Sequence, residues 1–149
     1  MGDPECQTIL PKLNSDLLEI FLACCDKSLK ETKIKWNKKK SLCVVLCSKG
    51  YPEKYEKNVE IENLNKIKLD NSNYLFHAGT KEKDKKIFAI GGRVLNFVTL
   101  SDKFSNAREN INKHLSELSW NKGFYRKDIG HKVIDEWESS QDILKVKKY

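Results

Sequence analysis

Three residues in the second half of the chain, Gly91-Gly92-Arg93, have the types and spacing of an oxyanion clip. Glycines let backbone N–H groups approach a ligand, and a guanidinium can hold two oxygens of a phosphate or carboxylate at once. Only three of the 28 basic residues are Arg. Because lysine serves almost everywhere else, an Arg beside a glycine pair favours two-point recognition of an anion. A hairpin turn with a surface Arg is the alternative interpretation.

Two further groups could contribute to an anion site. In Arg126-Lys127-Asp128, two cations precede a carboxylate, which fits a phosphate clamp and equally fits a local ion pair at a turn. His77 stands at the end of an expected strand and just before Gly79, where it could donate to a ligand oxygen or transfer a proton. A histidine that only forms a hydrogen bond at the end of a sheet explains that position as well.

The sequence argues against several other kinds of chemistry. It has no Walker loop, no dinucleotide-binding glycine motif and no Gly-x-Ser-x-Gly turn. The net charge of +7 comes from lysines scattered along the chain, which indicates a solvated surface and argues against a nucleic-acid partner. No histidine stands at zinc-finger spacing from a cysteine, so we predict small buried hydrophobes, with no structural zinc and no disulfide, at Cys6, Cys24, Cys25, Cys43 and Cys47.

A small number of helices and strands must position the candidate residues. Apolar residues at three- and four-residue steps predict a helix over residues 11–27 and a second helix that carries Phe104–Leu118, capped by Ser101 or Asp102. Alternating or β-branched runs predict strands over 32–36, 41–48, 59–61, 74–77, 85–89 and 94–100. The last two flank Gly91-Gly92 and are expected to form a hairpin. Grouped strands with helices around them indicate an α+β fold with a mainly antiparallel sheet.

Membrane contact is not expected from this sequence. No apolar run approaches the ~18–20 residues that a membrane span requires. The thiols have no evident disulfide partners, which favours a reducing, cytoplasmic location.

Five short motifs, in order and at matching spacing, resemble the carboxyl-terminal third of the phosphoribosylamine–glycine ligase family, also called glycinamide ribonucleotide synthetases. Each motif is weak alone, but together they extend over residues 2–130. The residues after Trp137 match nothing in the family. The motifs are Gly2–Gln7, Val44–Leu46 followed by Gly50–Pro52, Phe76–Thr80, Gly91–Leu95 and Phe124–Gly130.

The resemblance implies an ATP-grasp ligase of purine biosynthesis. Such a ligase phosphorylates the carboxylate of glycine with ATP, and the amine of phosphoribosylamine then captures the acyl phosphate. Magnesium or manganese bridges the nucleotide phosphates. By the same resemblance, residues 1–40 would end an ATP-grasp domain and residues 41–137 would form a small, β-rich, barrel-like domain with one packed helix. That domain is similar to the last domain of biotin carboxylase, and residues 138–149 would be a flexible tail.

The family's Glu-x-Asn metal-binding pair precedes Gly2, so the resemblance places the metal ligands upstream of Met1. We therefore expect no catalytic residue, bound ATP or bound metal on this chain. The resemblance puts Asp3 and Glu5 beside the nucleotide and glycine site. It implies that Arg93 grips the ribose 5-phosphate, and the other substrate-binding candidates are Gly91, Gly92, Arg126, Lys127 and His77.

Three interpretations stay open at this stage. The chain could be a ligase fragment that is inactive alone, and its partners would then be the missing N-terminal and ATP-grasp portions and small-molecule substrates. It could also be a stand-alone module that binds phosphorylated ligands or RNA. The third interpretation is a subunit that completes a split ligase.

Overall fold

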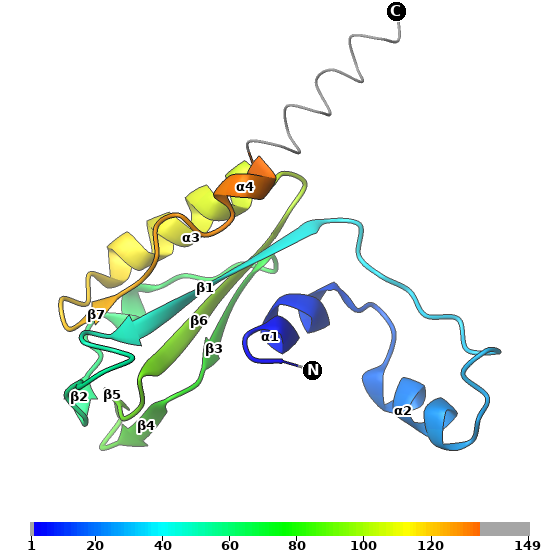
Figure 1. Cartoon of the computed structure of the whole chain (residues 1–149), viewed down its shortest axis with the longest axis horizontal. Helices are drawn as coiled ribbons and strands as arrows, with labels where there is room; N and C mark the ends of the chain where they lie inside the picture. Colours follow the sequence, from blue (N-terminus) through cyan, green and yellow to red (C-terminus); the bar gives the residue numbers. More distant parts are fainter. Residues whose placement is uncertain (1, 135–149) are drawn as a thin grey trace, which may run out of the picture.

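The computed structural model describes residues 2–134, and a four-stranded antiparallel sheet is its central element (Figure 1). The two long strands at its centre pair from Lys40–Ser101 to Leu46–Leu95. Their apolar and β-branched residues suit a strand that is covered by other elements. The predicted α+β class is therefore confirmed. The strand order is β3 (Asn73–His77), β6 (Arg93–Ser101), β1 (Lys40–Ser48) and β7 (Gly123–Phe124).

A second sheet of three strands contains β2 (Val59–Glu60), β5 (Lys86–Ala89) and β4 (Thr80–Lys83). Asp84 and Lys85 have φ angles of 50° and 61°, the conformation of the tight turn that joins β4 to β5. The predicted hairpin across Gly91-Gly92 is wrong, because β5 pairs with β4 and β2 whereas β6 pairs with β1 and β3. The glycine pair instead lies in the link from one sheet to the other.

The helix α3 (Phe104–Leu118) covers one face of the central sheet (Figure 1). Its buried residues recur at three- and four-residue steps and pack on the inner residues of β1 and β6. The predicted cap is wrong, because β6 continues to Ser101 and Lys103 takes the cap position without a side-chain hydrogen bond. The core residues of this layer include Ala107, Ile111, Leu115 and Leu118 from the helix and Leu42, Val44, Leu46, Leu95 and Phe97 from the strands.

The N-terminal segment does not form the predicted helix over residues 11–27. It contains α1 (Glu5–Ile9), a 3-10 turn η1 (Leu10–Lys12) and α2 (Leu17–Cys25). The interruption has a local cause, because the Asp16 carboxylate accepts hydrogen bonds from the first N–H groups of α2. The predicted strand over 32–36 is also wrong, since the structure has a single bridge there, between Leu13 and Trp36.

The helix α2 lies away from both sheets, and most of its apolar side chains are exposed (Figure 1). Ala23 is its one buried residue, whereas the side chains of Leu18, Phe21 and Leu22 are 64%, 52% and 54% exposed. The prediction of buried cysteines is wrong for this helix, where Cys24 and Cys25 are exposed. The other three, Cys6, Cys43 and Cys47, are half-buried, and all five thiols are free.

The predicted barrel-like shape is not found, because the strands within residues 2–134 form two open sheets. Two short elements complete the fold, the 3-10 turn η2 (Leu64–Lys66) and the helix α4 (His131–Val133). None of the helices in the described part of the chain is both long and apolar enough to cross a membrane. The predicted tail over 138–149 lies outside the described residues.

Candidate functional site at the Arg93 end of the central sheet

The start of β6 contains an irregularity that determines where Arg93 points. Leu46 pairs with Leu95, but the next residue of β1, Cys47, pairs with Arg93, so β6 has one extra residue here. An extra residue in a strand shifts the alternation of its side chains, so that the residues before it point to the opposite face of the sheet. Arg93 therefore leaves the α3 side of the sheet and faces the N-terminal segment.

The guanidinium of Arg93 holds Asp3. Its Nη1 donates to the backbone oxygen of Asp3 at 3.0 Å, and its Nη2 lies 2.9 Å from the Oδ2 of the same residue. Both side chains keep contact with solvent, with 41% of Arg93 and 52% of Asp3 exposed. The structure thus joins two residues that the sequence analysis had assigned to different parts of a site. Glu5, two residues after Asp3, lies in the first turn of α1, and its side chain is exposed.

Close packing of the backbone explains the glycine pair. A Cβ atom on Gly92 would overlap the ring of Tyr51, and one on Gly79 would lie 2.7 Å from the Cα of Gly91. The N–H of Gly91 donates to the oxygen of Gly79 at 3.1 Å. The N–H group of Gly91 is therefore used inside the protein, and the tight packing fixes the start of β6 beside the end of β3.

His77 lies close to Arg93 in the sheet. It pairs with Leu95 at the end of β3, and the following Gly79 donates its N–H to the oxygen of Arg93 at 2.9 Å. The His77 side chain is exposed, and its Nδ1 lies 3.0 Å from the Oγ1 of Thr80. His77 therefore lies at the same end of the sheet as Asp3, Gly91, Gly92 and Arg93. Its side chain shares the α3 face with Leu95, however, whereas Arg93 points to the opposite face.

Arg126 and Lys127 lie on a different side of the protein. The Nε and Nη2 of Arg126 donate to the two carboxylate oxygens of Asp128 at 3.0 and 2.6 Å. This hydrogen-bonded pairing lowers the pKa of Asp128 to about 2. Lys127 lines a hollow with Leu46 and Leu115, on the α3 side of the sheet, and its backbone oxygen accepts a hydrogen bond from Arg108. The structure does not join these two cations to Arg93.

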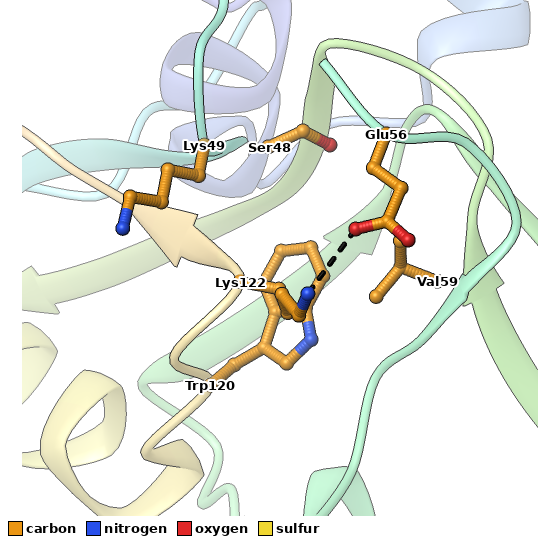
Figure 2. Close-up of a pocket in the computed structure, with 6 residues that line it drawn as sticks. All are labelled: Ser48, Lys49, Glu56, Val59, Trp120 and Lys122. Carbon is orange, nitrogen blue, oxygen red and sulfur yellow. Dashed lines mark hydrogen bonds and ion pairs between the residues drawn. The ribbon is translucent and has the colours of Figure 1, made fainter.

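A small hollow beside the glycine pair was missed by the sequence analysis (Figure 2). Its volume is about 140 Å³, and the ring of Trp120 forms one wall. Figure 2 shows Lys122 and Glu56 pointing toward one another, with their charged atoms 3.2 Å apart. The hydroxyl of Ser48 donates to the oxygen of Gly91 at 2.8 Å, so the hollow adjoins the Arg93 end of the sheet. Its residues come from three separate segments of the chain, around residues 48–49, 56–59 and 120–122, which no local motif would reveal.

Metal ligands do not gather in the described part of the chain. No group of three or more His, Cys, Asp or Glu side chains within residues 2–134 could hold a metal ion. Cys43 lies on the sheet face opposite α3, and burial raises its pKa to about 11. Burial also raises the pKa of Cys47, although the charge of Arg93 opposes this effect. The described residues therefore form no metal-ligand cluster, and the raised pKa values of Cys43 and Cys47 disfavour a reactive thiolate at either position.

The fold and the paired arginine define a small α+β domain with an anion-binding group at one end of its sheet. The domain itself is identified by comparison with known families. The chain belongs to the family described as the phosphoribosylglycinamide synthetase C domain, whose model matches residues 41–132.

The names of similar proteins agree with this family. The chain is 44% identical over 131 residues to the phosphoribosylamine–glycine ligase of Fusobacterium nucleatum, covering 87% of this chain and 31% of the relative. It is 41% identical over 139 residues to a bifunctional purine biosynthetic protein of Dictyostelium discoideum, covering 93% of this chain and 17% of that protein. The chain thus spans about a third of the single-function ligase, and it aligns with the carboxyl-terminal part.

A solved structure gives the same result. The crystal structure of the phosphoribosylamine–glycine ligase of Thermotoga maritima superposes with a TM-score of 0.63 and 28% identity. The match covers 87% of this chain and 31% of the ligase chain. The described fold is therefore similar to about one third of a larger ligase.

Proposed function

We propose that this chain supplies the carboxyl-terminal part of a phosphoribosylamine–glycine ligase in purine biosynthesis. In this reaction the glycine carboxylate takes the γ-phosphoryl group of ATP and releases ADP. The amine of phosphoribosylamine then attacks the acyl carbon, and phosphate leaves as the amide of glycinamide ribonucleotide forms. The family match over residues 41–132, together with 44% identity to a ligase, is the observation that carries the proposal.

The chain's own contribution is the positioning of substrates. Arg93 is held at the start of a packed strand and already binds one carboxylate, so its geometry suits an oxyanion. We assign the 5-phosphate of phosphoribosylamine to this guanidinium. His77 lies at the same end of the sheet but on its α3 face, so it would not share this contact. Asp3 and Glu5 would border the nucleotide and glycine. Arg126 and Lys127, which face the other side of the sheet, would contribute only at long range.

ATP and the magnesium or manganese ion would be held by the preceding portions of the ligase. The described residues of this chain offer no metal-ligand cluster, so the implied ion does not fit here. The exposed side chains of Leu18, Phe21 and Leu22 on α2 support this arrangement. An apolar patch of this kind is typical of a surface that packs against another part of a protein. Residues 1–40 lie outside the family match and would end that ATP-grasp portion, whereas residues 41–137 would form the terminal domain.

Two parts of the proposal rest on the resemblance alone. One is the similarity of the terminal domain to the last domain of biotin carboxylase. The other is the cytoplasmic location, which would place the chain with the other enzymes of purine biosynthesis.

A growth experiment tests the proposed function. The chain is fused behind the part of the Fusobacterium nucleatum ligase that precedes the matched region, and this chimera is placed in a strain that lacks its own ligase. We expect growth without added purines, whereas the shortened Fusobacterium ligase alone should give none. Growth when the two pieces are expressed separately would identify a subunit of a split ligase. A well-expressed chimera without growth would overturn the proposal.

A further inference from the structure

The guanidinium of Arg93 already holds an oxyanion that belongs to the protein itself. We infer that Asp3 and the phosphate of a phosphorylated ribose compete for Arg93, so that phosphate binding releases Asp3. This inference rests on the proposed function, in which Arg93 receives the 5-phosphate. It adds a ligand-dependent change in the N-terminal segment that the ligase reaction alone does not require.

The two anions are alternatives for the Nη1–Nη2 edge of the guanidinium, which is the edge that Asp3 occupies. A phosphate held by two parallel hydrogen bonds needs two N–H groups on one edge of the guanidinium. In the structure Asp3 engages both terminal nitrogens, through its backbone oxygen at 3.0 Å and its carboxylate at 2.9 Å. A two-point contact between phosphate and these nitrogens therefore requires Asp3 to leave.

The exchange is energetically accessible because both partners are exposed. Ion pairs between side chains that keep contact with water stabilise a protein only weakly. A phosphate group carries up to two negative charges and three acceptor oxygens, so it can replace a single carboxylate. Both Arg93 and Asp3 can be reached from solvent, with 41% and 52% of their side chains exposed.

Arg93 is the fixed partner and Asp3 is the partner that moves. Arg93 begins β6, where Gly79 donates to its backbone oxygen and Cys47 pairs with it across the sheet. Asp3 precedes α1, a helix of five residues. The far end of that helix stays attached to the sheet, because the hydroxyl of Ser41 donates to the oxygen of Thr8 at 2.7 Å. Release of Asp3 should therefore loosen only the first turn of α1.

That first turn provides a direct signal. The N–H of Cys6 donates to the oxygen of Gly2 at 3.0 Å, one residue before Asp3. When Asp3 leaves Arg93, this hydrogen bond should open more often and the amide of Cys6 should exchange faster with solvent. The amide of Leu46, in the centre of the sheet, should not change.

The test is a titration of the isotope-labelled 149-residue chain with D-ribose 5-phosphate, followed by NMR. We expect weak binding by the unmodified chain and binding about two- to fivefold tighter by Asp3→Asn, which removes the competing charge. Arg93→Lys should bind much more weakly. Glu53→Gln removes an exposed negative charge from the loop that carries Tyr51, and it should match the unmodified chain. Saturating ribose 5-phosphate should also speed exchange at Cys6.

The outcomes separate this inference from the proposed function. If Arg93→Lys loses binding but Asp3→Asn binds as the unmodified chain does, competition is overturned and the phosphate role of Arg93 stands. If Asp3→Asn and Glu53→Gln tighten binding of ribose 5-phosphate equally, the loss of one negative charge explains the effect and competition by Asp3 is overturned. If no variant binds ribose 5-phosphate, both the phosphate role and the competition are wrong.

Discussion

Arg93 and Asp3, which are 90 residues apart in the sequence, meet through two contacts of 3.0 and 2.9 Å. Arg93 belongs to the part of the chain that matches the family model, whereas Asp3 precedes it. The pair therefore connects the matched region, residues 41–132, to the segment that precedes it. An anion that binds Arg93 would act on this connection.

Replacement of Arg93 by lysine tests its role in the chimera with the Fusobacterium ligase. Lysine keeps the charge but loses the two-point grip, and a charge-assisted hydrogen bond contributes about 1.5–3 kcal/mol. We expect kcat/KM for phosphoribosylamine to fall by roughly 10- to 100-fold, with the KM values for ATP and glycine nearly unchanged.

Arg108→Lys is the matched control for this substitution. Arg108 lies on α3 and donates to the backbone oxygen of Lys127 at 2.6 Å, on the opposite side of the sheet from Asp3. Its loss should lower thermal stability slightly and leave substrate use unchanged. Equal kinetic effects of the two substitutions would show that Arg93 makes no special contact with substrate.

The exposed face of α2 should make the isolated chain self-associate. Leu18, Phe21 and Leu22 present a continuous apolar surface that has no cover in the described part of the chain. Sedimentation velocity should show dimers or larger species, and Leu18→Gln combined with Leu22→Gln should restore the monomer. Glu19→Gln, on the same helix, should not. A monomer at high concentration with well-protected α2 amides would contradict this account.

Packing at the glycine pair predicts a large effect from a small substitution. Gly92→Ala places a methyl group against the ring of Tyr51, which should lower the free energy of unfolding by about 1–3 kcal/mol. Gly2→Ala meets only the flexible end of the Glu5 side chain and should change stability by less than about 0.5 kcal/mol. Urea denaturation of both variants measures the difference, and equal midpoints would refute the packing argument.

Thiol reactivity should divide the cysteines by location. Cys24 and Cys25 are exposed on α2, whereas Cys43 is half-buried with a pKa raised to about 11. A raised pKa leaves about one thousandth of the Cys43 thiol as reactive thiolate at pH 8, and this fraction grows tenfold for each pH unit up to the pKa. Alkylation by iodoacetamide, followed by peptide mass spectrometry, should label Cys24 and Cys25 first. Equal rates at Cys43 would contradict its burial.

Local patterns were sufficient to predict the central elements. The apolar runs of β1 and β6 and the helical spacing in α3 are continuous over nine or more residues, and all three are confirmed. The failures come from effects that periodicity does not contain. The polar strand β4 forms because Asp84 and Lys85 turn the chain onto β5, and Asp16 caps a new helix inside one apolar pattern.

The site depends still more on long-range structure. The glycine pair and the rare arginine did mark Arg93 as a residue to examine. Its orientation, however, is set by one extra residue in β6 relative to β1. That irregularity arises from the pairing of Cys47 with Arg93, which are 46 residues apart in the sequence. The contact of Arg93 with Asp3 is a tertiary contact, and the hollow beside Gly91 is assembled from three separate segments of the chain. Such features follow only from the folded arrangement.

The most direct measurement is the rate at which purified protein forms glycinamide ribonucleotide from glycine, ATP and phosphoribosylamine. The account predicts no turnover by the 149-residue chain, because it spans only 31% of the length of the ligase it matches. It predicts turnover by the chimera that requires all three substrates. Turnover by the chain alone, or none by a folded chimera, would contradict the claim that this chain supplies the carboxyl-terminal part of the ligase.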